Sequence, residues 1–168
     1  GVFRKSDSAD AITLGAIVSL ALVAALVIWG GEGRQTAFGG AFVVDTFARV
    51  MKVLALFGSA VAIVLSVQFM KRDRSERFEY PVLILLSAVG MMTMISSNNL
   101  IALYMGLELQ SLALYVVAAI NRDSARASEA GLKYFVLGAL SSGMLLYGAS
   151  LVYGFTGTTA FPQIAEVL

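Results

Sequence analysis

The residue most able to do chemistry is Glu108, the only charged residue in an apolar stretch from about Asn98 to Ile120. About 20 apolar residues are enough for a helix to cross a bilayer. A carboxylate at the midpoint of such a helix costs about 2.5–3.5 kcal/mol on insertion scales, and intramembrane ionisable residues are by default functional. We therefore predict that Glu108 carries a proton or answers a partner charge. The structural alternative is a buried carboxyl group that only fixes helix packing.

Three polar side chains share a predicted helix face with Glu108. Tyr104 precedes it by four residues, and Ser111 and Tyr115 follow it by three and seven. Residues at these spacings lie along one stripe of a helix. The stripe predicts a polar seam that can hold water and a proton.

Lys133 is the second candidate, 25 residues after Glu108. If the two lie on neighbouring antiparallel helices, their depths differ by roughly 10 Å at 1.5 Å per residue. Direct contact is not expected, and water or a third group would have to connect them. In the alternative interpretation Lys133 extends to the membrane surface, or it pairs with Glu129 one turn earlier.

Two further patterns have structural interpretations. Asp45, Arg49 and Lys52 lie in the opening turns of an apolar segment, where Asp45 and Arg49 predict an i,i+4 ion pair at the outer membrane surface. Gly138 and Ser142 form a small-xxx-small pair, which predicts close packing of one helix on a neighbour.

Composition indicates a membrane protein. Of 168 residues, 58% are hydrophobic and 14% are charged, whereas ordinary soluble domains have about 25% charged residues. The net charge of +1 gives no case for a nucleic-acid partner. The chain has no Cys and no His, so we expect no disulfide, no thiolate chemistry, no His-metal site and no imidazole proton shuttle. The sequence also has no P-loop, dinucleotide fingerprint or metal-ligand cluster, so we expect no metal and no cofactor in this chain. Proton handling falls to Glu, Asp, Lys, Tyr or water.

Five apolar segments predict an all-α membrane protein. The segments lack the alternation of barrel strands and are too long for them, and spanning helices satisfy their own backbone hydrogen bonds. The short link at 97–99 predicts an antiparallel helical hairpin, the Gly-rich stretch 30–41 a loop, and Ser124 a helix cap. The predicted helices are about 11–29, 42–70, 81–97, 99–120 and 128–155.

Basic residues predict the orientation. Lys and Arg concentrate in cytoplasmic loops, and eight of them fall on one set of alternating connections, against Arg34 alone on the other. The N-terminal side is therefore predicted to be cytoplasmic. The polar start, Gly1 to Asp10, resembles no secretory signal and lacks Met, so we expect an internal piece of a longer protein. The eight basic residues are Arg4, Lys5, Lys71, Arg72, Arg74, Arg77, Arg122 and Arg126.

Two motifs carry a family resemblance. They are GLELQSL at 106–112 and ARASEAGLKYF at 125–135, followed by LGALSSG at 137–143. Together they resemble subunit N of proton-pumping NADH:quinone oxidoreductase, respiratory complex I. The resemblance is strongest from about Ser97 to Gly157. It implies an antiporter-like bundle built from inverted repeats, of which residues 1–168 form a partial transmembrane domain corresponding to family helices two to six.

The resemblance also implies roles. Glu108 matches the buried glutamate of the family's fifth helix, which takes part in proton transfer or electrostatic coupling. Lys133 matches the lysine of the sixth helix, part of a hydrated charged axis. The family's broken seventh helix and later lysines have no counterpart, so this piece holds the carboxylate without its usual lysine partner and cannot form a complete proton path.

The implied function is proton translocation coupled to quinone reduction in a bacterial inner membrane. Expected partners are other membrane subunits of complex I, lipid, protons and internal water. The resemblance implies no cofactor in this chain; NADH, FMN, iron–sulfur clusters and quinone would bind other subunits. Two alternatives stay open: a Na⁺/H⁺ antiporter or membrane-bound hydrogenase subunit, and a non-catalytic helical scaffold.

Overall fold

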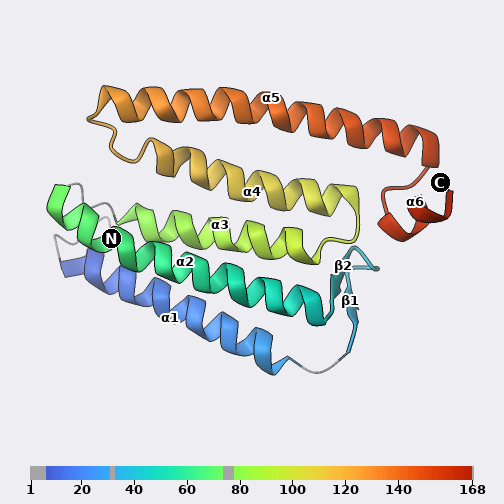
Figure 1. Ribbon diagram of the computed structural model, residues 1–168, viewed down its shortest axis with the longest axis horizontal. Helices are drawn as coiled ribbons and strands as arrows, with labels where there is room; N and C mark the ends of the chain where they lie inside the picture. Colours follow the sequence, from blue (N-terminus) through green and yellow to red (C-terminus); the bar gives the residue numbers. More distant parts are fainter. Residues whose placement is uncertain (1–6, 31–32, 74–77, 168) are drawn as a thin grey trace.

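The computed structural model describes residues 7–30, 33–73 and 78–167. Five of the described helices are long and apolar enough to cross a membrane, which confirms the predicted all-α membrane class. Figure 1 shows these five helices side by side in chain order, with sequential neighbours antiparallel. The elements are α1 (Asp7–Trp29), β1 (Gln35–Ala37), β2 (Phe42–Val44), α2 (Thr46–Asp73), α3 (Glu79–Ser96), α4 (Leu100–Ala118), α5 (Ala125–Thr156) and α6 (Phe161–Val167).

The apolar core lies among α1, α2 and α3. Ile63 of α2 is fully buried, and Leu20 of α1 and Ala88 of α3 are almost so. Helix α5 lies at the edge of the layer (Figure 1) and leaves large apolar side chains such as Leu137 and Met144 exposed. The packed core therefore lies on the side of the layer formed by α1, α2 and α3.

The backbones of helices α3 and α4 are in direct contact at two glycines, Gly90 and Gly106. A Cβ placed on Gly90 would lie 2.5 Å from the Gln110 amide nitrogen and 2.8 Å from the Gly106 carbonyl oxygen. A Cβ on Gly106 would lie 2.8 Å from the Met94 amide nitrogen. Only glycine fits at such a crossing, so these two residues hold α4 tightly against α3.

A small layer of extended chain covers one end of the bundle, here called the hairpin end. Strands β1 and β2 pair antiparallel, with Gln35 opposite Val44. The α3–α4 link lies between this hairpin and the segment before α6: the Asn98 amide donates to the Ala41 carbonyl oxygen at 2.8 Å, and the Leu100 amide to that of Thr159 at 2.9 Å. The link that positions α4 is therefore fixed on both sides.

The structure differs from the sequence prediction around β2. Residues 42–44, predicted as the start of a helix, are a strand, and β1 lies within the predicted loop 30–41. Helix α2 begins at Thr46 because the Asp45 carboxylate accepts the Ala48 amide at 2.7 Å, as an N-cap does. Arg49 donates to the Gly33 carbonyl oxygen at 3.2 Å, which ties the segment before β1 to α2.

Other differences are at the helix ends. Helix α6 was not predicted, and α5 begins at Ala125, earlier than the predicted 128, with Ser124 capping it as expected. Four residues used to predict orientation lie outside the described residues, so the cytoplasmic side stays a prediction. They are Arg4, Lys5, Arg74 and Arg77.

Candidate functional site between helices α4 and α5

Helices α4 and α5 form an antiparallel pair whose ends are fixed by local capping. The Asn99 side chain accepts the Ala102 amide at 2.6 Å, which fixes the start of α4. Ser124 caps the start of α5, and Gly157 ends it in the left-handed conformation at φ 70°. Glu108 thereby lies near the middle of α4, facing the middle of α5.

Within the part of the chain that the structure describes, the side-chain partner of Glu108 belongs to α5. The Ser142 hydroxyl donates to Oε1 of Glu108, and the Tyr104 hydroxyl lies 3.0 Å from the same Ser142 oxygen. Ser142 is buried, with 8% of its surface exposed. Glu108 and Tyr104, one turn apart on α4, are therefore joined through one serine on the neighbouring helix.

Sequence reasoning missed this role of Ser142. It assigned Ser142 to close packing as half of the Gly138/Ser142 pair. The available signal was its hydroxyl, because a serine in a small-residue stripe can hydrogen-bond across the interface where alanine cannot. The depth of Ser142 relative to Glu108 depends on how α5 is placed against α4, which motif spacing does not determine.

Ser111 and Tyr115, the other two residues of the predicted stripe, line a recess on the opposite side of Glu108 from Tyr104. We call it the polar recess. Its volume is about 220 Å³, which is room for more than one water molecule in a site with several hydroxyl partners. Its lining is Leu107, Ser111, Tyr115, Tyr134, Gly138, Ser141, Ser142 and Leu145.

Tyr115 is held against α5 by the absence of a side chain at Gly138. A Cβ at Gly138 would lie 1.9 Å from the Tyr115 hydroxyl oxygen and 2.5 Å from its ring. The Tyr115 ring also packs edge-on against Tyr134, with centroids 4.8 Å apart, and it is buried. Tyr115 thus lines the recess at a fixed place.

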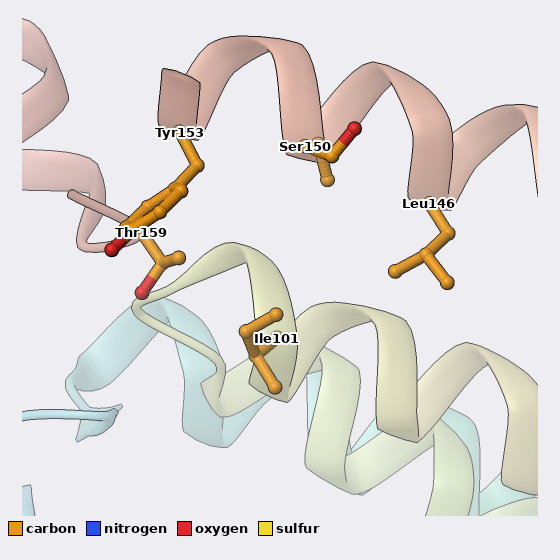
Figure 2. Close-up of a pocket in the computed structure, with 6 residues that line it drawn as sticks. Ile101, Leu146, Ser150, Tyr153 and Thr159 are labelled. Carbon is orange, nitrogen blue, oxygen red and sulfur yellow. The ribbon is translucent and has the colours of Figure 1, made fainter. Parts of the chain in front are cut away.

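A second cavity between the same helices has a different lining. This apolar groove, of about 290 Å³, lies at the hairpin end. Figure 2 shows Ile101 of α4 and Leu146 of α5 on its facing walls, with the Tyr153 ring beside Thr159. The Ser150 hydroxyl there donates to its own helix, to the Tyr147 carbonyl oxygen at 2.7 Å. The groove therefore offers mostly hydrocarbon.

Lys133 is not brought to Glu108. Its ammonium group pairs with Glu129 one turn earlier on α5, and both side chains are exposed, by 70% and 61%. Among the described residues no ion pair links Lys133 to Glu108. This matches the expected difference in depth, and it also matches the alternative in which Lys133 makes a surface pair.

Comparisons with known proteins agree with the motifs. Residues 97–168 match the model of the family described as "NADH:quinone oxidoreductase/Mrp antiporter, TM". The chain is 59% identical over its whole length to NADH-quinone oxidoreductase subunit N of Parvibaculum lavamentivorans, covering 35% of that protein. It is 57% identical to the subunit N of Rhodospirillum rubrum, over 99% of the chain and 35% of the relative. The resemblance to subunit N is confirmed.

The chain spans about a third of the length of these relatives. A solved structure has the same fold: a chain of the membrane-bound sulfane sulfur reductase, described as an archaeal respiratory membrane complex. Its TM-score to this chain is 0.74 at 22% identity, over 92% of this chain and 34% of that one. At this identity the likeness shows the fold alone.

Proposed function

We propose that this chain supplies Glu108 as a proton-carrying group in an antiporter-like membrane subunit of proton-pumping NADH:quinone oxidoreductase. The observation that carries the proposal is an ionisable side chain near the middle of α4 that is hydrogen-bonded across a helix interface to Ser142, which lines the polar recess. Relatives at 57–59% identity are named as subunit N. The proposed location is a bacterial inner membrane, with other membrane subunits of the complex as partners.

The physical basis is a balance between burial and charge. Burial favours the neutral form of a carboxyl group, and a nearby cation favours the ionised form. A change of charge or hydration near Glu108 during quinone reduction shifts this balance, and a proton is taken up or released. In this proposal Lys133 acts on Glu108 at a distance through the recess, while NADH, FMN, iron–sulfur clusters and quinone bind other subunits.

The test is proton pumping in membrane vesicles that carry the full-length subunit. Glu108→Gln should lower pumping at least about a hundredfold, because a proton-transfer group contributes typically 10²–10⁴-fold. Glu108→Asp, which keeps the carboxylate, is the matched control and should retain part of the activity. Normal pumping in vesicles that carry both Glu108→Gln and Lys133→Ala would rule the proposal out.

Two alternatives predict different outcomes. The matching family description includes Mrp antiporters, and sodium-dependent transport would favour a Na⁺/H⁺ antiporter instead. A scaffold role predicts that Glu108→Gln leaves pumping intact and changes only assembly on a native gel. Loss of pumping in a fully assembled complex excludes the scaffold.

A further inference from the structure

We propose that Ser142 is a positioning residue that works as a two-state hydrogen-bond switch for Glu108, with Tyr104 as its second member. The inference rests on the proposed function of Glu108 and goes further, because it assigns a task to a residue of α5. The observation is the continuous contact from Tyr104 through Ser142 to the Glu108 carboxylate.

The number of hydrogens on each hydroxyl group limits the direction of the hydrogen bonds that join Tyr104, Ser142 and Glu108. A serine hydroxyl carries one hydrogen and two lone pairs. When Glu108 is ionised its oxygens can only accept, so the Ser142 hydroxyl donates to Oε1. The contact between Tyr104 and Ser142 at 3.0 Å must then use the Tyr104 hydrogen. Both hydroxyls then point toward the carboxylate, which is the arrangement that stabilises its ionised form.

Protonation of Glu108 reverses the donor and acceptor in each of these hydrogen bonds. A protonated carboxyl group has a hydrogen of its own to donate, so it can donate to Ser142, and Ser142 can turn its hydrogen to the Tyr104 oxygen. Each orientation gives every one of the three groups at least one hydrogen bond within a partly buried interface, where an unpaired polar group is costly. Intermediate orientations leave one group unpaired. Ser142 therefore has two favoured states that follow the charge of Glu108.

The surroundings indicate that the Tyr104–Ser142–Glu108 hydrogen bonds act as a switch and do not conduct protons out of the site. One turn beyond Tyr104 the space between the helices is the apolar groove with Ile101 and Leu146 on its walls, which offers few partners for water. On the other side of Glu108 lies the polar recess with Ser111 and Tyr115. Protons therefore reach and leave Glu108 from the recess side, while the pair Ser142–Tyr104 orients the carboxyl group toward α5.

The experiment is a double-mutant cycle in the full-length subunit within the assembled complex. Ser142→Ala should slow pumping about tenfold or more, the size expected for one lost hydrogen bond to a charged group. Tyr104→Phe should slow it less, because it removes only the second donor. The double variant should equal Ser142→Ala, since Tyr104 acts only through Ser142. Ser142→Thr, which keeps a hydroxyl, should restore most of the rate.

Infrared difference spectra give a readout that a packing role does not move. The carboxyl band of Glu108, identified by its loss in Glu108→Gln, should shift in Ser142→Ala and shift less in Tyr104→Phe. Ser150→Ala is the control, because that hydroxyl bonds its own helix, and it should change neither rate nor band. An unmoved band and wild-type pumping in Ser142→Ala, or additive effects in the cycle, would overturn the switch. If Glu108→Gln itself pumps normally, the proposed function fails instead.

Discussion

Helix α4 has two faces that are built in opposite ways. Toward α3, Gly90 and Gly106 bring the two backbones together with no room for a Cβ. Toward α5, Glu108 meets Ser142 between two cavities of about 220 and 290 Å³. The first face, closed by these two glycines, fixes where α4 lies. The second leaves space and hydroxyl groups around the one carboxylate, so rigidity and chemistry are divided between two sides of one helix.

The largest expected effect comes from breaking the tight face. Gly106→Ala places a Cβ 2.8 Å from the Met94 amide nitrogen and 2.9 Å from the Gly90 carbonyl oxygen. Because backbone cannot move aside cheaply, we expect a loss of about 3 kcal/mol, the upper end for overpacking, measured by thermal or denaturant unfolding in detergent. The control is Gly58→Ala on α2, where nothing lies within 4 Å. Equal stability of the two variants would contradict the tight face.

A smaller effect is expected from overpacking the open face. Gly138→Ala forces the Tyr115 ring out of its place on α5, but a side chain can move where backbone cannot. We expect about 1–2 kcal/mol of destabilisation and a partly filled polar recess. Gly143→Ala on the same helix meets nothing within 4 Å and should be neutral or slightly stabilising. Tyr115→Ala combined with Gly138→Ala should remove the clash between the new Cβ and the Tyr115 ring. A crystal structure or cryo-EM map would show whether α4 and α5 return to their original spacing.

The caps that begin the two helices should differ in strength. Asn99 accepts the Ala102 amide at 2.6 Å, whereas Ser124 accepts the Ala127 amide at 3.4 Å. Asn99→Ala should cost about 1 kcal/mol, as cap removal typically does, and Ser124→Ala less than that. Unfolding midpoints of both variants provide the measurement. The reverse order would mean that α5 and not α4 is the more firmly anchored helix.

The smallest effect on stability is expected at Lys133. Its pair with Glu129 is exposed on both sides, and exposed pairs contribute about 0–1 kcal/mol. Glu129→Gln should therefore leave the unfolding midpoint almost unchanged. If Lys133 acts electrostatically on Glu108, Lys133→Ala should reduce pumping while Glu129→Gln does not. Equal pumping in the wild type, Lys133→Ala and Glu129→Gln would mean that Lys133 is only a surface residue.

Much of the fold follows from the sequence because spanning helices must be long and apolar. The five helices and the α3–α4 hairpin required only hydropathy and the short link at 97–99. Strand β2 was read as helix because Phe42, Val43 and Val44 extend the apolar run of α2, and only the cap at Asp45 separates them. Helix α6 is too short for a hydropathy pattern.

The part of the candidate site that lies on α4 could be predicted from the sequence, whereas the part on α5 could not. Glu108 and its stripe lie on one helix, so their common face follows from helical spacing. Ser142 lies on another helix, and its meeting with Glu108 depends on how α4 and α5 are rotated and staggered. Those quantities depend on the contact of Gly138 with the Tyr115 ring and of Gly131 with Ala119, and such packing is decided in three dimensions.

The most direct test of the central claim is to observe the protonation of Glu108 during turnover. Infrared difference spectra of the assembled complex, before and during quinone reduction, should contain a protonated-carboxyl band that changes with turnover and is absent in Glu108→Gln. Glu108→Asp should keep a band at a shifted position. If the spectra of the wild-type complex and the Glu108→Gln variant are identical in the carboxyl region, Glu108 does not change protonation, and its role in proton translocation is contradicted.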